Sequence, residues 1–286
     1  MSRVNYPVSP EVMITSIYKS LTKSEQKVAD IVRNQLKDAV YWSVSDLAEH
    51  AEVGETTVIR FCRKLGYKGY QDFKLSVAQN PTEANKQEFG EVQDTDSVEI
   101  LAQKVTAENC TTLQNTLSLV QPKSIEEASG KIINANKIYC FGVGASGLMA
   151  HQAQYRFMRI GLNAVCVSDS HVIAMNCALA KEGDVVIGIS TSGSTKDLVD
   201  AIEIAKKNKA FIICLTNHIK SPITKLADVV LLTSAKESPL RGGAFSSLIS
   251  QMHVLDILTR HIEIERKDSS MDALQKTAKS VSDKLY

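Results

Sequence analysis

The stretch that decides the fold is DVVIGISTSGSTKDL, residues 184–198. Its first half is a run of apolar, mostly β-branched residues that is typical of a buried parallel strand. Small hydroxyl residues follow, and apolar residues then recur at helical spacing, which predicts a helix over 195–208 capped by Thr195 or Ser194. The hydroxyl groups therefore lie between the carboxyl end of a strand and the amino end of a helix. Because free backbone N–H groups and the helix dipole favour an anion there, the stretch predicts a phosphate pocket.

A well-capped turn without a ligand is the alternative interpretation of these hydroxyl groups. Ser and Thr favour caps and turns for their own sake, so the stretch alone leaves both interpretations open. Its place at a strand–helix junction favours the ligand site, since open α/β sheets bind ligands at such ends. A nucleotide P-loop is disfavoured because GxxxxGK[ST] is absent and Lys196 follows Ser-Thr with a single glycine nearby.

Strand-like and helical patterns alternate around this stretch. Short apolar runs predict strands at 137–143, 163–167, 184–190, 210–215 and 228–233. Helical patterns lie between them, at 145–160, 170–181, 195–208 and 221–227, and a last one, at 246–263, has an apolar stripe wide enough for core packing or a dimer interface. Such alternation predicts an α/β domain of three layers, a parallel sheet with helices on both faces.

The first of these strands ends in GVGASG, residues 142–147, and Asp169 follows the second. Taken alone, this pattern is typical of a dinucleotide fingerprint, so an NAD(H)-responsive redox repressor is one alternative. In a doubly wound sheet, however, the first and third strands can be neighbours, which would let Ser146 meet Ser190 and Ser192. Two hydroxyl loops favour a phosphate plus a sugar over a pyrophosphate.

The first 80 residues form a separate helical pattern. Thr22 and Glu25 have the spacing of a capping box before a helix, and a second short helix begins near Ser43 or Ser45. A third helix follows a short turn, as in a helix-turn-helix. Residues 54–74 hold five basic and two acidic side chains, which suits DNA contact, although a helical protein-interaction domain with a basic face stays an alternative. The residues expected to face outward from the third helix are Glu55, Thr56, Thr57, Ile59, Arg60, Arg63 and Lys64.

Composition limits the remaining choices. The chain has 286 residues, 44% of them hydrophobic and 23% charged, with a net charge of +1, which fits one or two globular domains. It shows no apolar run of membrane-spanning length, no signal peptide and no CxxC pair among its six cysteines, so we expect a cytoplasmic protein that does not bind membranes. Residues 81–100 hold six acids and one base, which is typical of a linker. The expected divisions are 1–80, a linker and connecting helix at 81–121, an α/β domain at 122–270 and a tail at 271–286.

Three segments of the helical part resemble a known family. LTKSEQKVADIV (21–32), SVSDLA (43–48) and TTVIRFCRKLGYKGYQDFK (56–74) are similar to the N-terminal domain of the RpiR family of bacterial transcription regulators. The resemblance implies an all-α helix-turn-helix domain whose third helix recognises DNA. Carried onto this chain, it implies as DNA-binding residues Thr56, Thr57, Ile59, Arg60 and Lys64.

The C-terminal half resembles the sugar isomerase (SIS) domain over roughly 122–265, on GVGAS (142–146) and STSGST (190–195). The resemblance implies a phosphosugar held by Ser146, Ser190, Ser192 and Thr195, with Ser192, Gly193, Ser194 and Thr195 nearest the phosphate. A late loop, KESPLRGGAFSS (236–247), supplies Glu237 as a candidate for a sugar hydroxyl. Arg241, in the same loop, suits either the phosphate or the surface.

An SIS domain can catalyse isomerisation, which needs a positioned base. The candidates are Glu237, His151, His171 and His218, and neither His151 nor His171 has a partner in the sequence that would tune its pKa. We therefore expect no catalytic residue, no cofactor and, because the histidines are dispersed, no metal; an isomerase is the less favoured alternative. The prediction is a transcription regulator, a homodimer or homotetramer that binds an inverted-repeat DNA operator and responds to a phosphosugar. Which phosphosugar, and whether it releases or promotes DNA binding, stays open.

Overall fold

The computed structural model describes residues 10–35, 42–78, 92–235 and 245–284. The chain divides into two compact units, Met1–Ser118 and Leu119–Tyr286. Together they confirm the predicted fold class, an all-α helix-turn-helix domain joined to an α/β domain with a parallel sheet. The finer divisions predicted at 80, 121 and 271 stay predictions.

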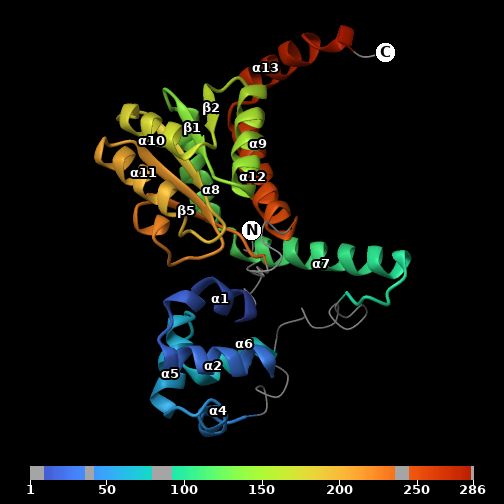
Figure 1. The fold of residues 1–286 in the computed structure, drawn as a ribbon, viewed down its shortest axis with the longest axis vertical. Coiled ribbons are helices and arrows are strands. Elements are labelled where there is room, and N and C mark those ends of the chain that lie inside the picture. Colours follow the sequence, from blue (N-terminus) through green and yellow to red (C-terminus); the bar gives the residue numbers. More distant parts are fainter. Residues whose placement is uncertain (1–9, 36–41, 79–91, 236–244, 285–286) are drawn as a thin grey trace. The chain divides into compact units, whose positions relative to one another are not determined.

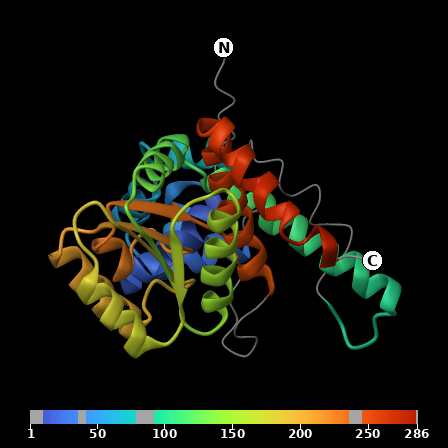
Figure 2. The ribbon, with the colours of Figure 1, turned by 90° about the horizontal axis from the view of Figure 1, so that it is seen from above.

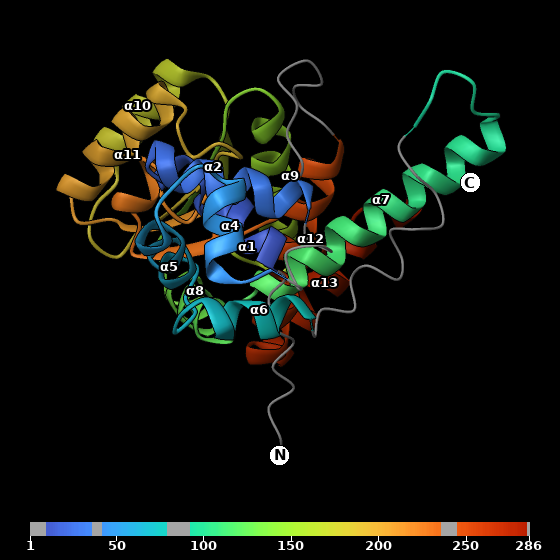
Figure 3. The same cartoon turned by 90° about the horizontal axis from the view of Figure 1, so that it is seen from below.

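The first unit is helical (Figure 3). Thr22 and Glu25 form the predicted capping box at the start of α2, and Ser43, not Ser45, caps α4 through a second box with Asp46. Each box satisfies backbone donors that a helix start leaves free, which is why these helices begin where they do. The elements are α1 (Pro10–Ile17), η1 (Tyr18–Ser20), α2 (Lys23–Asn34), α4 (Val44–His50), α5 (Glu55–Lys64), α6 (Tyr70–Ala78) and α7 (Val98–Leu119).

Helix α5 packs against α2 and α4, and α4 leads into α5 through a tight turn. Val53 N donates to Ala48 O at 2.9 Å in this turn, and Glu52 has the left-handed conformation, with φ 52°. Many helix-turn-helix motifs have glycine where this turn begins, because a side chain is strained there. The core of the unit consists mainly of Ile14, Ile17, Val28, Ala29, Val32, Leu47, Ala48, Val58, Phe61, Cys62 and Phe73.

The second unit contains a five-stranded sheet in which every pair of neighbouring strands is parallel. The strand order is β2-β1-β3-β4-β5, so the first and third strands are neighbours as the sequence predicts. The registers Ile138↔Val185 and Phe141↔Gly188 align their ends. The strands are β1 (Ile138–Phe141), β2 (Ala164–Val167), β3 (Val185–Ile189), β4 (Phe211–Thr216) and β5 (Val229–Leu232).

Helices cover both faces of the sheet (Figures 1 and 2). On β1, Ile138 and Cys140 belong to one buried cluster with α8, α9 and α12, whereas Tyr139 and Phe141 belong to another with α10 and α11. Alternate residues of a strand point to opposite faces, so the three layers follow from the strand periodicity. The helices are α8 (Pro122–Ile133), α9 (Ala145–Arg159), α10 (Ser170–Leu179), α11 (Lys196–Lys207) and α12 (Phe245–Glu265).

Two details differ from the sequence-based expectation. The helix expected at 221–227 is a single 3₁₀ turn, η3 (Ile223–Lys225), and residues expected as a tail contain most of α13 (Lys267–Lys279). The apolar stripe of α12 serves the core, since Leu255, Leu258 and Ile262 are buried there.

Candidate functional site

The two hydroxyl loops leave the same edge of the sheet. β1 and β3 are parallel neighbours, and each is followed at its carboxyl end by one of the loops, 142–146 and 190–195. Segments almost fifty residues apart in the sequence are therefore next to each other at this edge, which is where open parallel sheets bind ligands.

The loop after β1 depends on glycine. A Cβ at Gly142 would lie 2.5 Å from the backbone oxygen of Ser146, so only glycine lets the strand end and the first turn of α9 approach this closely. Gly144 has a φ of 61° and caps α9. Ser146 lies in the first turn of that helix and is 9% exposed.

Ser190 is turned into the loop after β3. It is 2% exposed, its hydroxyl accepts a hydrogen bond from Gly193 N at 3.1 Å, and it shares another with the Thr195 hydroxyl at 3.1 Å. These bonds close the turn that leads from β3 into α11. In this structure Ser190 therefore shapes the loop, and its oxygen is already engaged.

The middle of this loop is fixed by neighbours from the segment after β4 and from α12. Gly193 has a φ of 61°, and a Cβ there would lie 2.2 Å from Ser221 Oγ. Thr191 O accepts from Asn217 N, and Thr191 Oγ1 accepts from Nε2 of Gln251 at 3.0 Å. Sequence reasoning missed Gln251, since it lies 60 residues along the chain on a helix whose apolar pattern hides it.

The remaining hydroxyl groups are more accessible. Ser194 is exposed and Ser192 and Thr195 are half-buried, and all three precede the first turn of α11. Thr195 is the N-cap residue by position, as predicted, but its side chain caps no backbone N–H. At the start of α11, hydroxyl groups therefore lie beside backbone N–H groups that the Thr195 side chain does not cap, an arrangement that suits an anion.

Other predicted residues lie elsewhere. Glu237 and Arg241 are outside the described residues. His151 and His171 are exposed and His218 is buried. Asp169, the acid expected of a dinucleotide site, accepts a hydrogen bond from Val172 N at 2.9 Å and so caps α10.

A cleft of about 470 Å³ opens at the opposite edge of the sheet, where β3 and β4 begin. Its lining mixes Lys131, Lys206 and Lys209 with Asp184 and Asp228. No residue of the hydroxyl loops 142–146 and 190–195 lines this cleft. Because ligands of open parallel sheets bind at the carboxyl ends of the strands, we place the candidate site at the other edge.

The predicted DNA-reading residues of α5 do not all face outward. Thr56, Arg60 and Arg63 are exposed and Ile59 is half-buried. The expectation that Thr57 faces outward is wrong, because it is 7% exposed and belongs to the face of α5 that packs inside the domain. Its hydroxyl accepts a hydrogen bond from Arg60 Nη2 at 3.4 Å.

Lys64 is exposed too, but its side chain already has an ionic partner. Its ammonium donates to Oε2 of Glu25, a residue of α2, at 2.6 Å. In contrast, neither Arg60 nor Arg63 pairs with a carboxylate in the part of the chain that the structure describes. Among the described residues, the two arginines are therefore the cations of α5 without an ion pair.

Comparison with known proteins identifies both units. Residues 10–83 match the helix-turn-helix domain of the rpiR family, and residues 131–260 match the SIS domain. An uncharacterized HTH-type transcriptional regulator of Haemophilus influenzae is 35% identical, with 92% of this chain and 93% of that protein covered. The chain belongs to the RpiR family. As an RpiR-family protein, it is a transcriptional regulator with a helix-turn-helix and an SIS domain.

Two further comparisons cover nearly the whole of this RpiR-family chain. The HTH-type transcriptional regulator HexR of Escherichia coli is 30% identical over 96% of this chain and 94% of its own length. The solved structure of the Vibrio vulnificus NanR protein complexed with ManNAc-6P is 30% identical, has a TM-score of 0.63 and covers 96% of this chain and 99% of that one.

The described residues of this RpiR-family protein form neither a membrane-spanning helix nor a metal-binding cluster. No helix among them is long and apolar enough to cross a membrane. They also contain no group of three or more His, Cys, Asp or Glu side chains arranged to hold a metal ion.

Proposed function

We propose that this regulator binds a phosphosugar effector at the carboxyl edge of β1 and β3, and that the effector changes its affinity for an operator. The observation that carries the proposal is the strand order, which brings the loops 142–146 and 190–195 to one edge of the sheet. The NanR protein, 30% identical to this chain, was solved in complex with a phosphosugar, ManNAc-6P, which supports the ligand class.

The phosphate is held at the start of α11 in this proposal. Ser192, Ser194 and Thr195 supply hydroxyl donors, and the backbone N–H groups and dipole of the helix start add to them. Gly193 gives the backbone room to turn, and Ser190 holds the turn closed. Ser146 contributes from the neighbouring loop. Glu237 stays a prediction for a sugar hydroxyl.

On the DNA side, we propose that α5 reads the operator through Thr56, Ile59 and Arg60, with Arg63 on a phosphate. Thr57 acts through Arg60 by the hydrogen bond between their side chains. The protein works as a homodimer or homotetramer on an inverted repeat, because two related reading helices need two related half-sites. Genes of sugar catabolism are the proposed targets.

Two alternatives are weaker. An NAD(H) sensor needs an acid for the ribose, and Asp169 already caps α10. A sugar-phosphate isomerase shares the fold, but the curated relatives described above are named as transcriptional regulators, so we propose binding without turnover.

The test measures operator binding and melting temperature of the full chain. Hexose, amino-sugar and acid-sugar phosphates form one panel, and NAD and NADH form the second. We expect one phosphosugar to raise the melting temperature and change operator affinity, and the nucleotides to do neither. Stabilisation by NADH alone would overturn the effector assignment and favour GVGASG as a dinucleotide loop.

A further inference from the structure

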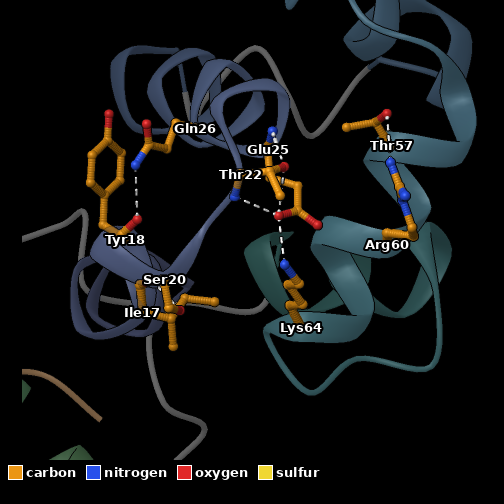
Figure 4. A network of polar contacts seen from close by, with 9 residues as sticks. All are labelled: Ile17, Tyr18, Ser20, Thr22, Glu25, Gln26, Thr57, Arg60 and Lys64. Atoms are coloured by element: carbon orange, nitrogen blue, oxygen red, sulfur yellow. Dashed lines mark hydrogen bonds and ion pairs between the residues drawn. The ribbon is translucent and has the colours of Figure 1, made fainter. Parts of the chain in front are cut away.

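Glu25 connects the start of α2 to the end of α5 (Figure 4). One oxygen of its carboxylate, Oε2, accepts three hydrogen bonds: from Thr22 N at 2.8 Å, from Thr22 Oγ1 at 2.9 Å and from Lys64 Nζ at 2.6 Å. The first belongs to the capping box of α2, whose other bond runs from Glu25 N to Thr22 Oγ1, and the second joins the side chains of the same two residues. The third reaches a residue 39 positions further along the chain, in the last turn of α5.

This contact is buried on one side. The side chain of Glu25 is 3% exposed and that of Lys64 is 34% exposed. Burial alone would raise the pKa of the Glu25 carboxyl, but the hydrogen bonds from Lys64 and Thr22 outweigh it and lower the pKa. A buried carboxylate that loses its cation is strongly destabilising, so the Lys64 ammonium is held where it is.

Polar bonds therefore hold α5 at both ends. At its first residue, Glu55 Oε1 accepts from the Ser45 hydroxyl of α4 at 2.5 Å, and at its last residue Lys64 bonds to α2. Between them, apolar residues such as Phe61 pack into the core. Apolar packing has no directional preference, whereas hydrogen bonds fix how a helix slides and turns. The Ser45–Glu55 bond is exposed, whereas the carboxylate of the Glu25–Lys64 pair is buried, so this pair is the stronger restraint.

We propose that Lys64 is a positioning residue for DNA reading, which acts through Glu25 to fix α5 and does not bind a DNA phosphate. This proposal rests on the proposed function, in that α5 reads the operator. A binding site works only when its side chains are held close to the productive geometry, and Arg60 lies one turn before Lys64 on the same helix.

The experiment uses the full chain and a labelled duplex selected by the wild-type protein from random DNA. Lys64→Met and Glu25→Gln each remove one charge of the pair, and both should weaken binding roughly tenfold and lower the melting temperature. The variants should not be additive, so that the double variant binds about as well as either single one. Lys64→Arg keeps the charge and should bind nearly as the wild type does.

The salt dependence separates a positioning residue from a phosphate contact. Each neutralised phosphate contributes about 0.9 to the slope of log affinity against log salt concentration. Lys64→Met should leave this slope unchanged, whereas the matched control Arg63→Met should reduce it by about 0.9 at an unchanged melting temperature. The two variants remove the same charge from adjacent positions.

Three results would overturn the proposal. One is a reduced slope in Lys64→Met at an unchanged melting temperature, and another is tighter DNA binding by Glu25→Gln, which frees the lysine for a phosphate. The third is a lower melting temperature in both variants with unchanged affinity. Arg60→Ala distinguishes a failure of this proposal from a failure of the proposed function. If Arg60→Ala also binds the operator normally, α5 does not read the DNA.

Discussion

Helix α5 is the proposed DNA reader and loop 190–195 is the proposed effector site. In both, some of the residues predicted to contact a ligand instead make bonds that stabilise the protein itself. In α5, Lys64 pairs with Glu25 and Thr57 packs inward. In the loop, Ser190 closes the turn. The two regions differ in how far away the partner lies. Ser190 bonds within its own loop, whereas Lys64 bonds to another helix.

This difference separates two kinds of structural residue. A hydroxyl that bonds within its own turn affects mainly that turn, so its loss should be felt locally. A charged group that links two helices affects the placement of a whole recognition surface. Polar residues in a functional motif are therefore either contact residues or residues that hold the contact residues in place. The separation in the sequence between a holding residue and its bonding partner indicates how widely a substitution acts.

The largest expected effect is on effector binding. Ser192→Ala with Ser194→Ala removes two of the three accessible hydroxyl groups, and each lost hydrogen bond to a charged group costs about 1.5–3 kcal/mol. Binding of the cognate phosphosugar should weaken roughly a hundredfold or more if the losses add. Titration calorimetry measures it. The melting temperature without effector should fall only slightly, because the hydrogen bonds that the two hydroxyl groups make, Ser194 N to Ser192 Oγ and Ser194 Oγ to Ser192 O, are exposed.

Ser190→Ala is the matched control, since it removes the same group from a buried position. It should lower the stability of the second unit by about 1 kcal/mol, because the loop loses two hydrogen bonds, one of them bridging to Thr195. Operator binding without effector should survive in both variants. A normal effector response from the Ser192/Ser194 variant would mean that STSGST is only a capping turn and that the effector binds elsewhere.

The next effect is on DNA sequence specificity. Arg60→Ala should cost about 1–3 kcal/mol on the selected operator if Arg60 reads a base, and much less on unrelated DNA. Competition between the two duplexes measures the ratio. Equal losses on both would make Arg60 a phosphate contact, and no loss on either would exclude α5 as the reader.

Periodicity predicted most of the fold. Strands and helices of the second unit lie within a few residues of the expected ranges, because a buried sheet requires continuous apolar runs and helices require an apolar stripe. The neighbouring position of β1 and β3 was also expected. The exceptions are 221–227, where Pro222 precedes a single 3₁₀ turn, and the helices α8 and α13, which were not among the predicted helices.

The site was less predictable, and for a physical reason. Whether a side chain is available depends on partners that local sequence does not reveal. Which residues of α5 face outward depends on their angle around the helix axis. An error of one position in that angle places the buried Thr57 on the outward face. Glu25 already has a local role in its capping box, and nothing in the sequence indicates that it also bonds Lys64.

Acid should distinguish the two regions. The lowered pKa of Glu25 means that its contribution to stability is fully present above the ordinary value of 4.5 and is lost as pH falls through the folded value. The stability advantage of the wild type over Glu25→Gln should therefore hold at neutral pH and shrink below about 4.5. Hydroxyl groups of the effector loop do not titrate in this range. An advantage unchanged at pH 3 would contradict the ion pair.

The smallest effects concern backbone strain, and the chain has a matched pair for it. Glu52 in the first unit and Lys209 in the second are the residues other than glycine with positive φ among those described, at 52° and 64°. Lys209 follows the end of α11, where Lys209 N donates to Lys206 O and Ala210 N donates to Ala205 O. This bond pattern is the Schellman motif, which favours glycine at that position.

Glycine at either position should relieve strain at little other cost. A side chain in the left-handed region costs about 1–2 kcal/mol, partly offset by the greater freedom of glycine in the unfolded chain. Glu52→Gly also loses the ion pair between Glu52 and Lys27. The Lys27 side chain is 54% exposed and that of Glu52 is 81% exposed, so this loss of stability is small. Each variant should gain about 0.5–1 kcal/mol, Glu52→Gly in the first unit and Lys209→Gly in the second. Hydrogen exchange of the full chain assigns the gain to a unit. A loss of stability in Glu52→Gly alone would show that the Glu52 side chain supports the turn, and a loss of operator affinity with it would add Glu52 to the residues that position α5.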